Sequence, residues 1–138
     1  MNDFVSSFNF IDTKDQAVAY SDIYKDFCSP APMDRLLCGD VGFGKTEIAM
    51  RAAFIAVLQK SPVVVLCPTT VLCHQLYESF SSRLSPFSVN VGSVSRLNKT
   101  SEVESLIRSF NDGSIDVLVC THRVFSYLSK IEFVGFLV

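Results

Sequence analysis

The chain has 138 residues, a length that suits one domain. Hydrophobic residues make up 49% of it, enough for a real core, while charged residues make up 19% and the net charge is only −2. Because nucleic-acid-binding domains are often strongly basic, this balance excludes binding through bulk charge and leaves only local contacts. We also expect no secretory signal, since the first ten residues carry no Lys or Arg. No membrane span is expected, because the apolar runs are far shorter than the ~20 residues needed.

The five cysteines are odd in number, and no pair has metal-ligand spacing. Cys38, Cys67 and Cys120 lie in or at the ends of apolar runs, where cysteine behaves as a small hydrophobic residue. Reduced thiols of this kind are typical of cytosolic proteins. We therefore expect core thiols in a cytoplasmic protein.

The first predicted element is a helix over 14–27, where apolar residues recur at helical spacing. Asp12 or Thr13 is placed to cap its start. Two prolines then break regular structure and predict a loop over 28–32. A short apolar strand is expected over 35–38, and it leads into a glycine-rich loop.

After that loop, an alanine-rich helix is predicted over 45–58. The run 63–67 is continuously apolar, as buried strands of parallel sheets are, and Pro68 ends it. A second long helix is expected over 71–84, followed by a short strand over 89–91.

The remaining elements alternate in the same way: helix 102–110, strand 115–120, short helix 123–128 and strand 136–138. Thr100 or Ser101 is placed to cap the first of these helices, and the Asn-Asp-Gly segment at 111–113 stops it. Such alternation predicts an α/β fold, a three-layer parallel sheet with helices on both faces and right-handed crossovers.

The glycine-rich segment 39–46 matches the pattern G-x-x-x-x-G-K-[ST] between a predicted strand and a predicted helix. The glycines let several backbone N–H groups surround phosphate oxygens, and the helix N-terminus adds partial positive charge. Lys45 is expected to reach the β- and γ-phosphates of ATP, and the Thr46 hydroxyl to coordinate Mg²⁺. These two are the catalytic candidates. The predicted nucleotide contacts here are Gly39, Asp40, Val41, Gly42, Phe43, Gly44, Lys45, Thr46 and Glu47. The alternative is an ordinary glycine-rich strand–turn–helix junction.

The segment 32–54, P-M-D-R-L-L-C-G-D-V-G-F-G-K-T-E-I-A-M-R-A-A-F, resembles the motor domain of the bacterial transcription-repair coupling factor. That family is a superfamily 2 double-stranded DNA translocase, related to RecG-type helicases. The resemblance implies a RecA-like P-loop lobe that uses ATP and Mg²⁺ and contacts DNA. It further implies that the full-length parent works with RNA polymerase and excision-repair proteins.

Other segments agree with this resemblance. T-K-D-Q at 13–16 resembles the family's T-x-D-Q, and in such motors Gln16 reads the adenine edge; otherwise it is an exposed polar residue near a helix start. Pro-Thr-Thr at 68–70 resembles motif Ia, which implies DNA phosphate contacts from Thr69 and Thr70, although either also suits a helix cap.

Two further segments resemble the family less closely. Ser-Arg at 95–96 resembles its S-R-F segment, with Leu97 in place of Phe, so Arg96 is either a DNA contact or a solvated side chain. Thr121 and His122 resemble its G-T-H segment, with Cys120 in place of Gly. For this pair we expect contact with a DNA strand or packing at the end of the sheet. We do not expect His122 to act as a metal ligand or a base.

The family's D-E-x-x box would follow the strand at 136–138, where this sequence stops. The expectation is a single partial helicase domain over 1–138, with an N-terminal helix over 12–28 and a P-loop core over 33–138. No other carboxylate is an obvious substitute, since Asp40 lies in the loop, Glu47 on the next helix, and Asp112 and Asp116 near a strand entry. We therefore expect impaired hydrolysis, and an incomplete sheet edge that invites self-association.

The sequence thus predicts the ATP-binding part of a DNA translocase motor that acts in transcription-coupled repair. The alternative is a non-catalytic nucleotide-binding or protein-interaction module. A small P-loop kinase is a third reading, but it leaves the Pro-Thr-Thr and Thr-His segments unexplained.

Overall fold

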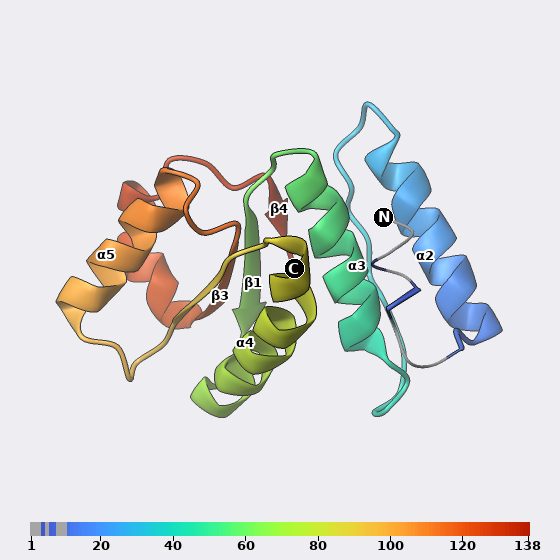
Figure 1. The fold of residues 1–138 in the computed structure, drawn as a ribbon, viewed down its shortest axis with the longest axis horizontal. Helices are drawn as coiled ribbons and strands as arrows, with labels where there is room; N and C mark the ends of the chain where they lie inside the picture. Colours follow the sequence, from blue (N-terminus) through green and yellow to red (C-terminus); the bar gives the residue numbers. More distant parts are fainter. Residues whose placement is uncertain (1–3, 5, 8–10) are drawn as a thin grey trace. The chain divides into compact units, whose positions relative to one another are not determined.

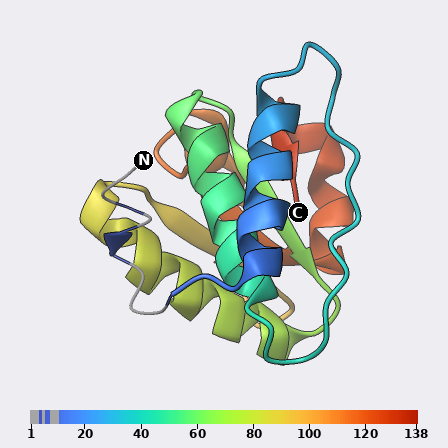
Figure 2. The same cartoon turned by 90° about the vertical axis from the view of Figure 1, so that its right-hand side faces the viewer.

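A computed structural model describes residues 4, 6, 7 and 11–138 of the chain. The chain divides into two compact units, 1–55 and 56–138, and each is described by itself. The colours in Figures 1 and 2 follow the sequence, from blue at the start of the first unit to red at the end of the second. In the described residues no helix is long and apolar enough to cross a membrane.

Among the described residues of the first unit are helices α2 and α3 and the long loop between them. Helix α2 covers Lys14–Phe27, the predicted bounds, because both ends are locally encoded. At its start Thr13 accepts from the Gln16 N–H, while the Gln16 side chain accepts from the Thr13 N–H, a capping box that satisfies two free donors. Helix α3 covers Lys45–Leu58, also as predicted, and its last turn belongs to the second unit.

The predicted strand over 35–38 is wrong, because this segment pairs with none of the described strands and has no regular structure. Leu36 is 86% exposed and Cys38 is exposed too, so the core position expected for Cys38 is also wrong. Strand structure depends on a partner for each backbone N–H and C=O, and a short segment with three apolar residues does not provide one.

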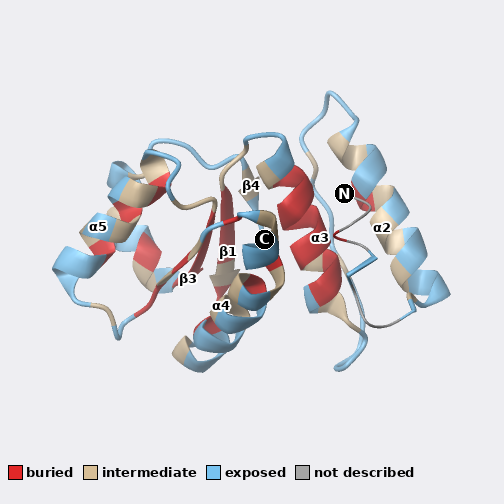
Figure 3. Ribbon diagram, viewed as in Figure 1, coloured by how far each residue is buried: buried red, intermediate tan, exposed pale blue. Residues whose placement is uncertain are grey.

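The second unit contains a four-stranded, wholly parallel sheet in the order β2-β3-β1-β4. Its strands are β1 (Val63–Cys67), β2 (Val91–Val94), β3 (Val117–Thr121) and β4 (Phe136–Leu137). The central strands β1 and β3 are almost continuously buried, which explains their unbroken apolar sequences (Figure 3). The predicted α/β fold with a parallel sheet is confirmed.

Helices cover both faces of this sheet. On one face, α5 (Thr100–Asn111) and the 3₁₀ helix η2 (His122–Lys130) pack against alternate strand residues. The core there joins these helices to the strands through Val64, Val94, Val103, Ile107, Phe110, Leu118, Cys120 and Val124. On the other face lies α4 (Thr70–Leu84), whose buried Cys73 Sγ lies 3.7 Å from the Val119 carbonyl oxygen.

Several boundaries differ from the predictions, for a tertiary reason in β2 and a local one in α5. The strand expected over 89–91 is Val91–Val94, because its register is set by pairing with β3, where Val91 faces Val117. Helix α5 begins at Thr100, two residues before the predicted start, because the Glu102 carboxylate accepts from the Lys99 N–H at 3.0 Å. The N-cap residue is Lys99, so the predicted cap at Thr100 or Ser101 is wrong. The helix ends at Asn111, one residue after the predicted end, and the Asn-Asp-Gly segment stops it as expected, with Gly113 at φ +79°.

Cys67, Cys73 and Cys120 are buried in the second unit, whereas Cys28 and Cys38 are exposed in the first. Burial, with Cys67 close by, raises the pKa of Cys73 and of Cys120 to about 12. These two groups are therefore neutral thiols at physiological pH. The predicted core thiols are confirmed for Cys67 and Cys120.

Candidate nucleotide and nucleic-acid sites

In the first unit, the lysine of the glycine-rich loop forms hydrogen bonds with the backbone of that loop. The Lys45 ammonium donates to the carbonyl oxygens of Gly39 and Asp40, each at 2.6 Å. Gly42 and Gly44 have φ values of +84° and +73°, in the left-handed region that favours glycine. The backbone angles that the pattern requires are therefore present in this loop.

The same loop fits an anionic ligand. The backbone N–H groups of Gly42, Gly44, Lys45 and Thr46 donate to no oxygen of the described residues. They lie where α3 begins, so its partial positive charge adds to theirs. The Thr46 hydroxyl is on an exposed residue at the same helix start. Loop geometry and donors thus fit phosphate oxygens, with Thr46 accessible to a bound cation.

Gln16 is held between the start of α2 and the glycine-rich loop. Its Oε1 accepts from the Thr13 N–H at 2.8 Å, and its Nε2 donates to the Phe43 carbonyl oxygen at 3.0 Å. A Cβ atom on Gly44 would collide with that amide nitrogen. The side chain is therefore neither free nor merely exposed, and it couples α2 to the loop.

Glu47, the last predicted nucleotide contact, is 5% exposed and accepts from the Arg51 Nε–H at 3.0 Å. Arg51 is 1% exposed, and its Nη1 and Nη2 donate to the two Asp12 carboxylate oxygens at 2.7 and 2.8 Å. Burial lowers the Arg51 pKa, but the hydrogen bonds to Asp12 and Glu47 outweigh it, so the pKa is raised. Glu47 thus belongs to a buried ionic cluster behind the loop.

In the second unit, every residue predicted to contact nucleic acid lines one hollow of about 400 Å³, which we call the carboxyl-edge hollow. Thr69 and Thr70 follow β1, Arg96 follows β2, and Thr121 and His122 end and follow β3. Because neighbouring parallel strands end at the same edge of a sheet, three distant segments meet there. Pro68 and Arg123 complete the lining.

For some of these side chains, the structure shows the alternative role that was considered beside DNA contact. Thr69 is the N-cap of α4 and accepts from the Leu72 N–H at 3.1 Å, so the capping role is present. Arg96 is exposed, and Thr121 is 9% exposed. The His122 ring packs edge-on against Phe125, with centroids 5.4 Å apart, which fits the predicted packing role. No cluster of three His, Cys, Asp or Glu residues able to hold a metal occurs in the part of the chain described.

Sequence reasoning missed Arg123. It lines the carboxyl-edge hollow, and its Nη1 donates to the Ser95 carbonyl oxygen at 3.2 Å. Its position directly after Thr-His was the available signal, but only the fold brings it beside the segment after β2.

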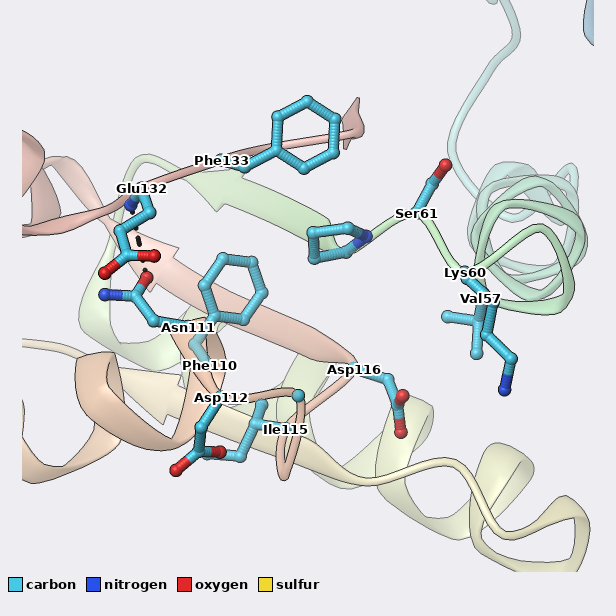
Figure 4. Close-up of a pocket in the computed structure, with 12 residues that line it drawn as sticks. Val57, Lys60, Ser61, Phe110, Asn111, Asp112, Ile115, Asp116, Glu132 and Phe133 are labelled. Atoms are coloured by element: carbon cyan, nitrogen blue, oxygen red, sulfur yellow. Dashed lines mark hydrogen bonds between the residues drawn. The ribbon is translucent and has the colours of Figure 1, made fainter.

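A second hollow, of about 410 Å³, lies at the opposite, amino edge of the same sheet (Figure 4). Asp112, Asp116 and Glu132 line it, together with Lys60. Hydrogen bonds from Ser114 hold the pKa of Asp112 below its usual range, which favours its charged form. The expected position of Asp112 and Asp116 near a strand entry is confirmed.

Comparison with known proteins agrees with this fold. A family model described as DEAD/DEAH box helicase matches residues 13–138, nearly the whole chain. The chain therefore belongs to the DEAD/DEAH box helicase family.

Its relatives include transcription-repair-coupling factors. The chain is 43% identical over 135 residues to that of Haemophilus influenzae, covering 98% of the chain and 12% of the relative. It is 47% identical over 121 residues to that of Myxococcus xanthus, covering 88% and 10%. The chain thus spans about a tenth of these relatives, and the predicted resemblance to this family is confirmed.

A solved structure of RecG bound to a three-way DNA junction is also similar. It superimposes with a TM-score of 0.88 at 30% identity, covering 98% of this chain and 18% of RecG. The expected RecA-like helicase fold is therefore confirmed.

Proposed function

We propose that this chain is the nucleotide-binding part of an ATP-dependent DNA translocase motor that acts in transcription-coupled repair. The observation that carries the proposal is the carboxyl-edge hollow, in which five residues predicted from three separate segments come together. Its sequence relatives are coupling factors, and the similar RecG structure holds a DNA junction, which supports DNA as the ligand. RNA polymerase and excision-repair proteins are the partners proposed for a full-length protein.

In this proposal the loop 39–46 binds the phosphates of ATP. Lys45 exchanges its two carbonyl acceptors for β- and γ-phosphate oxygens, and the exposed backbone N–H groups donate to the same phosphates. Thr46 holds Mg²⁺, which when bound neutralises the charge that develops in phosphoryl transfer. We propose that Gln16, whose Nε2 donates to the Phe43 carbonyl oxygen of the loop, also reads the adenine edge.

We further propose that this chain binds ATP more readily than it hydrolyses it. The carboxylate nearest in sequence to the loop on α3, Glu47, is buried and hydrogen-bonded to Arg51, so it is not free to orient water. Hydrolysis depends on such positioning together with charge stabilisation.

At the carboxyl-edge hollow, DNA is proposed to bind through its backbone. Threonine hydroxyls, backbone N–H groups at the start of α4 and guanidinium groups suit phosphate oxygens. Such contacts are local, so they need no net positive charge on the chain.

The test is to measure nucleotide binding and DNA-stimulated ATP hydrolysis for the chain and its Lys45→Ala variant. We expect the chain to bind a fluorescent ATP analogue and the variant to lose that binding. Equal affinity in the two proteins would refute the nucleotide site. ATP binding with neither DNA binding nor hydrolysis would favour a non-catalytic nucleotide-binding module. DNA-stimulated hydrolysis above the variant would refute the proposal that hydrolysis is impaired.

A further inference from the structure

The segment after β2 forms a tight, well-bonded turn. The Ser95 carbonyl oxygen accepts from the Asn98 N–H at 3.2 Å, and the Ser95 N–H donates to Asn98 Oδ1 at 2.8 Å. The Ser95 hydroxyl oxygen also accepts from the Leu97 N–H at 3.3 Å. Ser95 is 7% exposed, whereas Arg96 between these bonds is exposed. Asn98 and Ser95 thus fix the backbone that carries Arg96 at the rim of the carboxyl-edge hollow.

Arg123 ties this turn to the segment after β3. Its Nη1 donates to the same Ser95 carbonyl oxygen, across the neighbouring ends of β2 and β3. A guanidinium has five N–H donors. In the described chain this contact is the single hydrogen bond of the Arg123 side chain, so its other donors are available to the hollow it lines.

The positive charge of the carboxyl-edge hollow is not balanced by an acidic residue in its lining. None of its lining residues is acidic, and neither Arg96 nor Arg123 pairs with a carboxylate of the described residues. If Arg123 only held the two segments together, a half-buried cation without an acidic partner would not be needed beside threonine hydroxyls. Two guanidiniums with hydroxyl and N–H donors match consecutive phosphates of a nucleic-acid backbone.

We propose that Arg123 is a second cationic phosphate ligand of the carboxyl-edge hollow, and that Arg123 and Asn98 are positioning residues for Arg96. This inference rests on the proposed DNA-binding function and adds residues that bind or orient the phosphate.

The test measures binding of a short fluorescent DNA duplex by anisotropy, from low to moderate salt. Arg123→Gln should weaken binding about tenfold, the effect of losing a charge-assisted hydrogen bond. It should also reduce the slope of log K against log salt by about 1, because one phosphate contact is lost. Arg108→Gln on α5 is the matched control: it removes the same charge outside the hollow and should leave both quantities nearly unchanged.

Asn98 separates positioning from direct contact, because it carries no charge. Asn98→Ala should weaken binding about threefold with an unchanged salt slope, since no phosphate contact is removed. In an Arg96→Gln background the same substitution should have almost no effect, because the group it positions is absent. Arg123→Lys should keep the salt slope but recover only part of the affinity, since lysine lacks the planar fork. If Arg123→Gln lowers the melting temperature, the Arg123→Lys variant still tests the phosphate contact.

Failure of the inference is distinguishable from failure of the proposed function. If the chain shows no salt-dependent DNA binding, or Arg96→Gln changes nothing, the DNA-binding proposal is overturned and the inference with it. If Arg96→Gln weakens binding but Arg123→Gln behaves like Arg108→Gln, only the role of Arg123 is overturned. If Asn98→Ala weakens binding equally in both backgrounds, the positioning role is overturned.

Discussion

The buried Arg51 cluster offers the sharpest test of the first unit. Arg51 donates to both Asp12 oxygens and to Glu47, and its guanidinium carbon lies 5.6 Å from the centre of the Tyr20 ring. Asp12 directly precedes the cap of α2, whereas Arg51 and Glu47 are on α3. The cluster therefore fastens the start of α2 to the middle of α3, and with it the contact from Gln16 to the loop.

Truncating this arginine should be costly. Arg51→Ala leaves Glu47, 5% exposed, without the arginine that accompanies it in the interior. Breaking a buried ion pair by removing one partner costs about 3–5 kcal/mol. Lys25→Ala is the control, since Lys25 forms an ion pair with Asp22 on the surface of α2 and is 72% exposed. Loss of an exposed pair costs about 0–1 kcal/mol.

The assay is urea unfolding followed by far-UV circular dichroism, paired with nucleotide titration. We expect Arg51→Ala to lower the free energy of unfolding by several times more than Lys25→Ala, and to weaken ATP binding because Gln16 loses its anchor. Adding Glu47→Gln to Arg51→Ala should recover part of the loss, because the buried charge is removed. A loss below about 1 kcal/mol for Arg51→Ala would show that the cluster is screened by water and would refute this reasoning.

Three further predictions follow from the described geometry. Gly44→Ala should weaken nucleotide binding and destabilise the fold by about 1–2 kcal/mol, because φ is +73° and the new Cβ collides with the Gln16 amide; unchanged affinity and melting temperature would contradict it. Thr69→Val should lower stability by about 1 kcal/mol in thermal unfolding, because α4 loses its cap, whereas Thr69→Ser should be nearly neutral. Cys73 and Cys120, whose pKa is about 12 in the fold, should favour folding below about pH 8.5, where the unfolded thiols are still protonated. That contribution should be lost as pH rises towards 12, and a Cys73→Val variant should show a smaller alkaline loss.

Local chemistry made much of the fold and of the candidate nucleotide site predictable. The bounds of α2 follow from its capping box, and α3 begins where the lysine of the phosphate-loop pattern begins. The strand β1 was predictable because a short, continuous apolar run between a helix and a proline is typical of a buried parallel strand. The glycines of the loop announce left-handed backbone angles, since other residues adopt them at a cost.

Pairing between distant segments was not predictable in the same way. The segment 35–38, with three consecutive apolar residues after Arg35, has the pattern of a strand. A strand exists only where another strand supplies hydrogen bonds, and none of the described strands does so here. The position of β2 similarly depends on its pairing with β3. The strand is therefore Val91–Val94 and not 89–91 as predicted. The same error of inference placed Cys38 in the core, since its burial depended on that strand.

The sequence by itself determined the glycine-rich loop, the caps of α2 and α4 and the family, because each is encoded in consecutive residues. The tertiary structure decided how the separated segments meet. Parallel strands that end at one edge bring Thr69, Arg96 and Thr121 into a single hollow, and the same convergence places Arg123 against Ser95. That arrangement depends on strand order and crossover direction, which no local pattern specifies, so the second arginine became visible only in the folded chain.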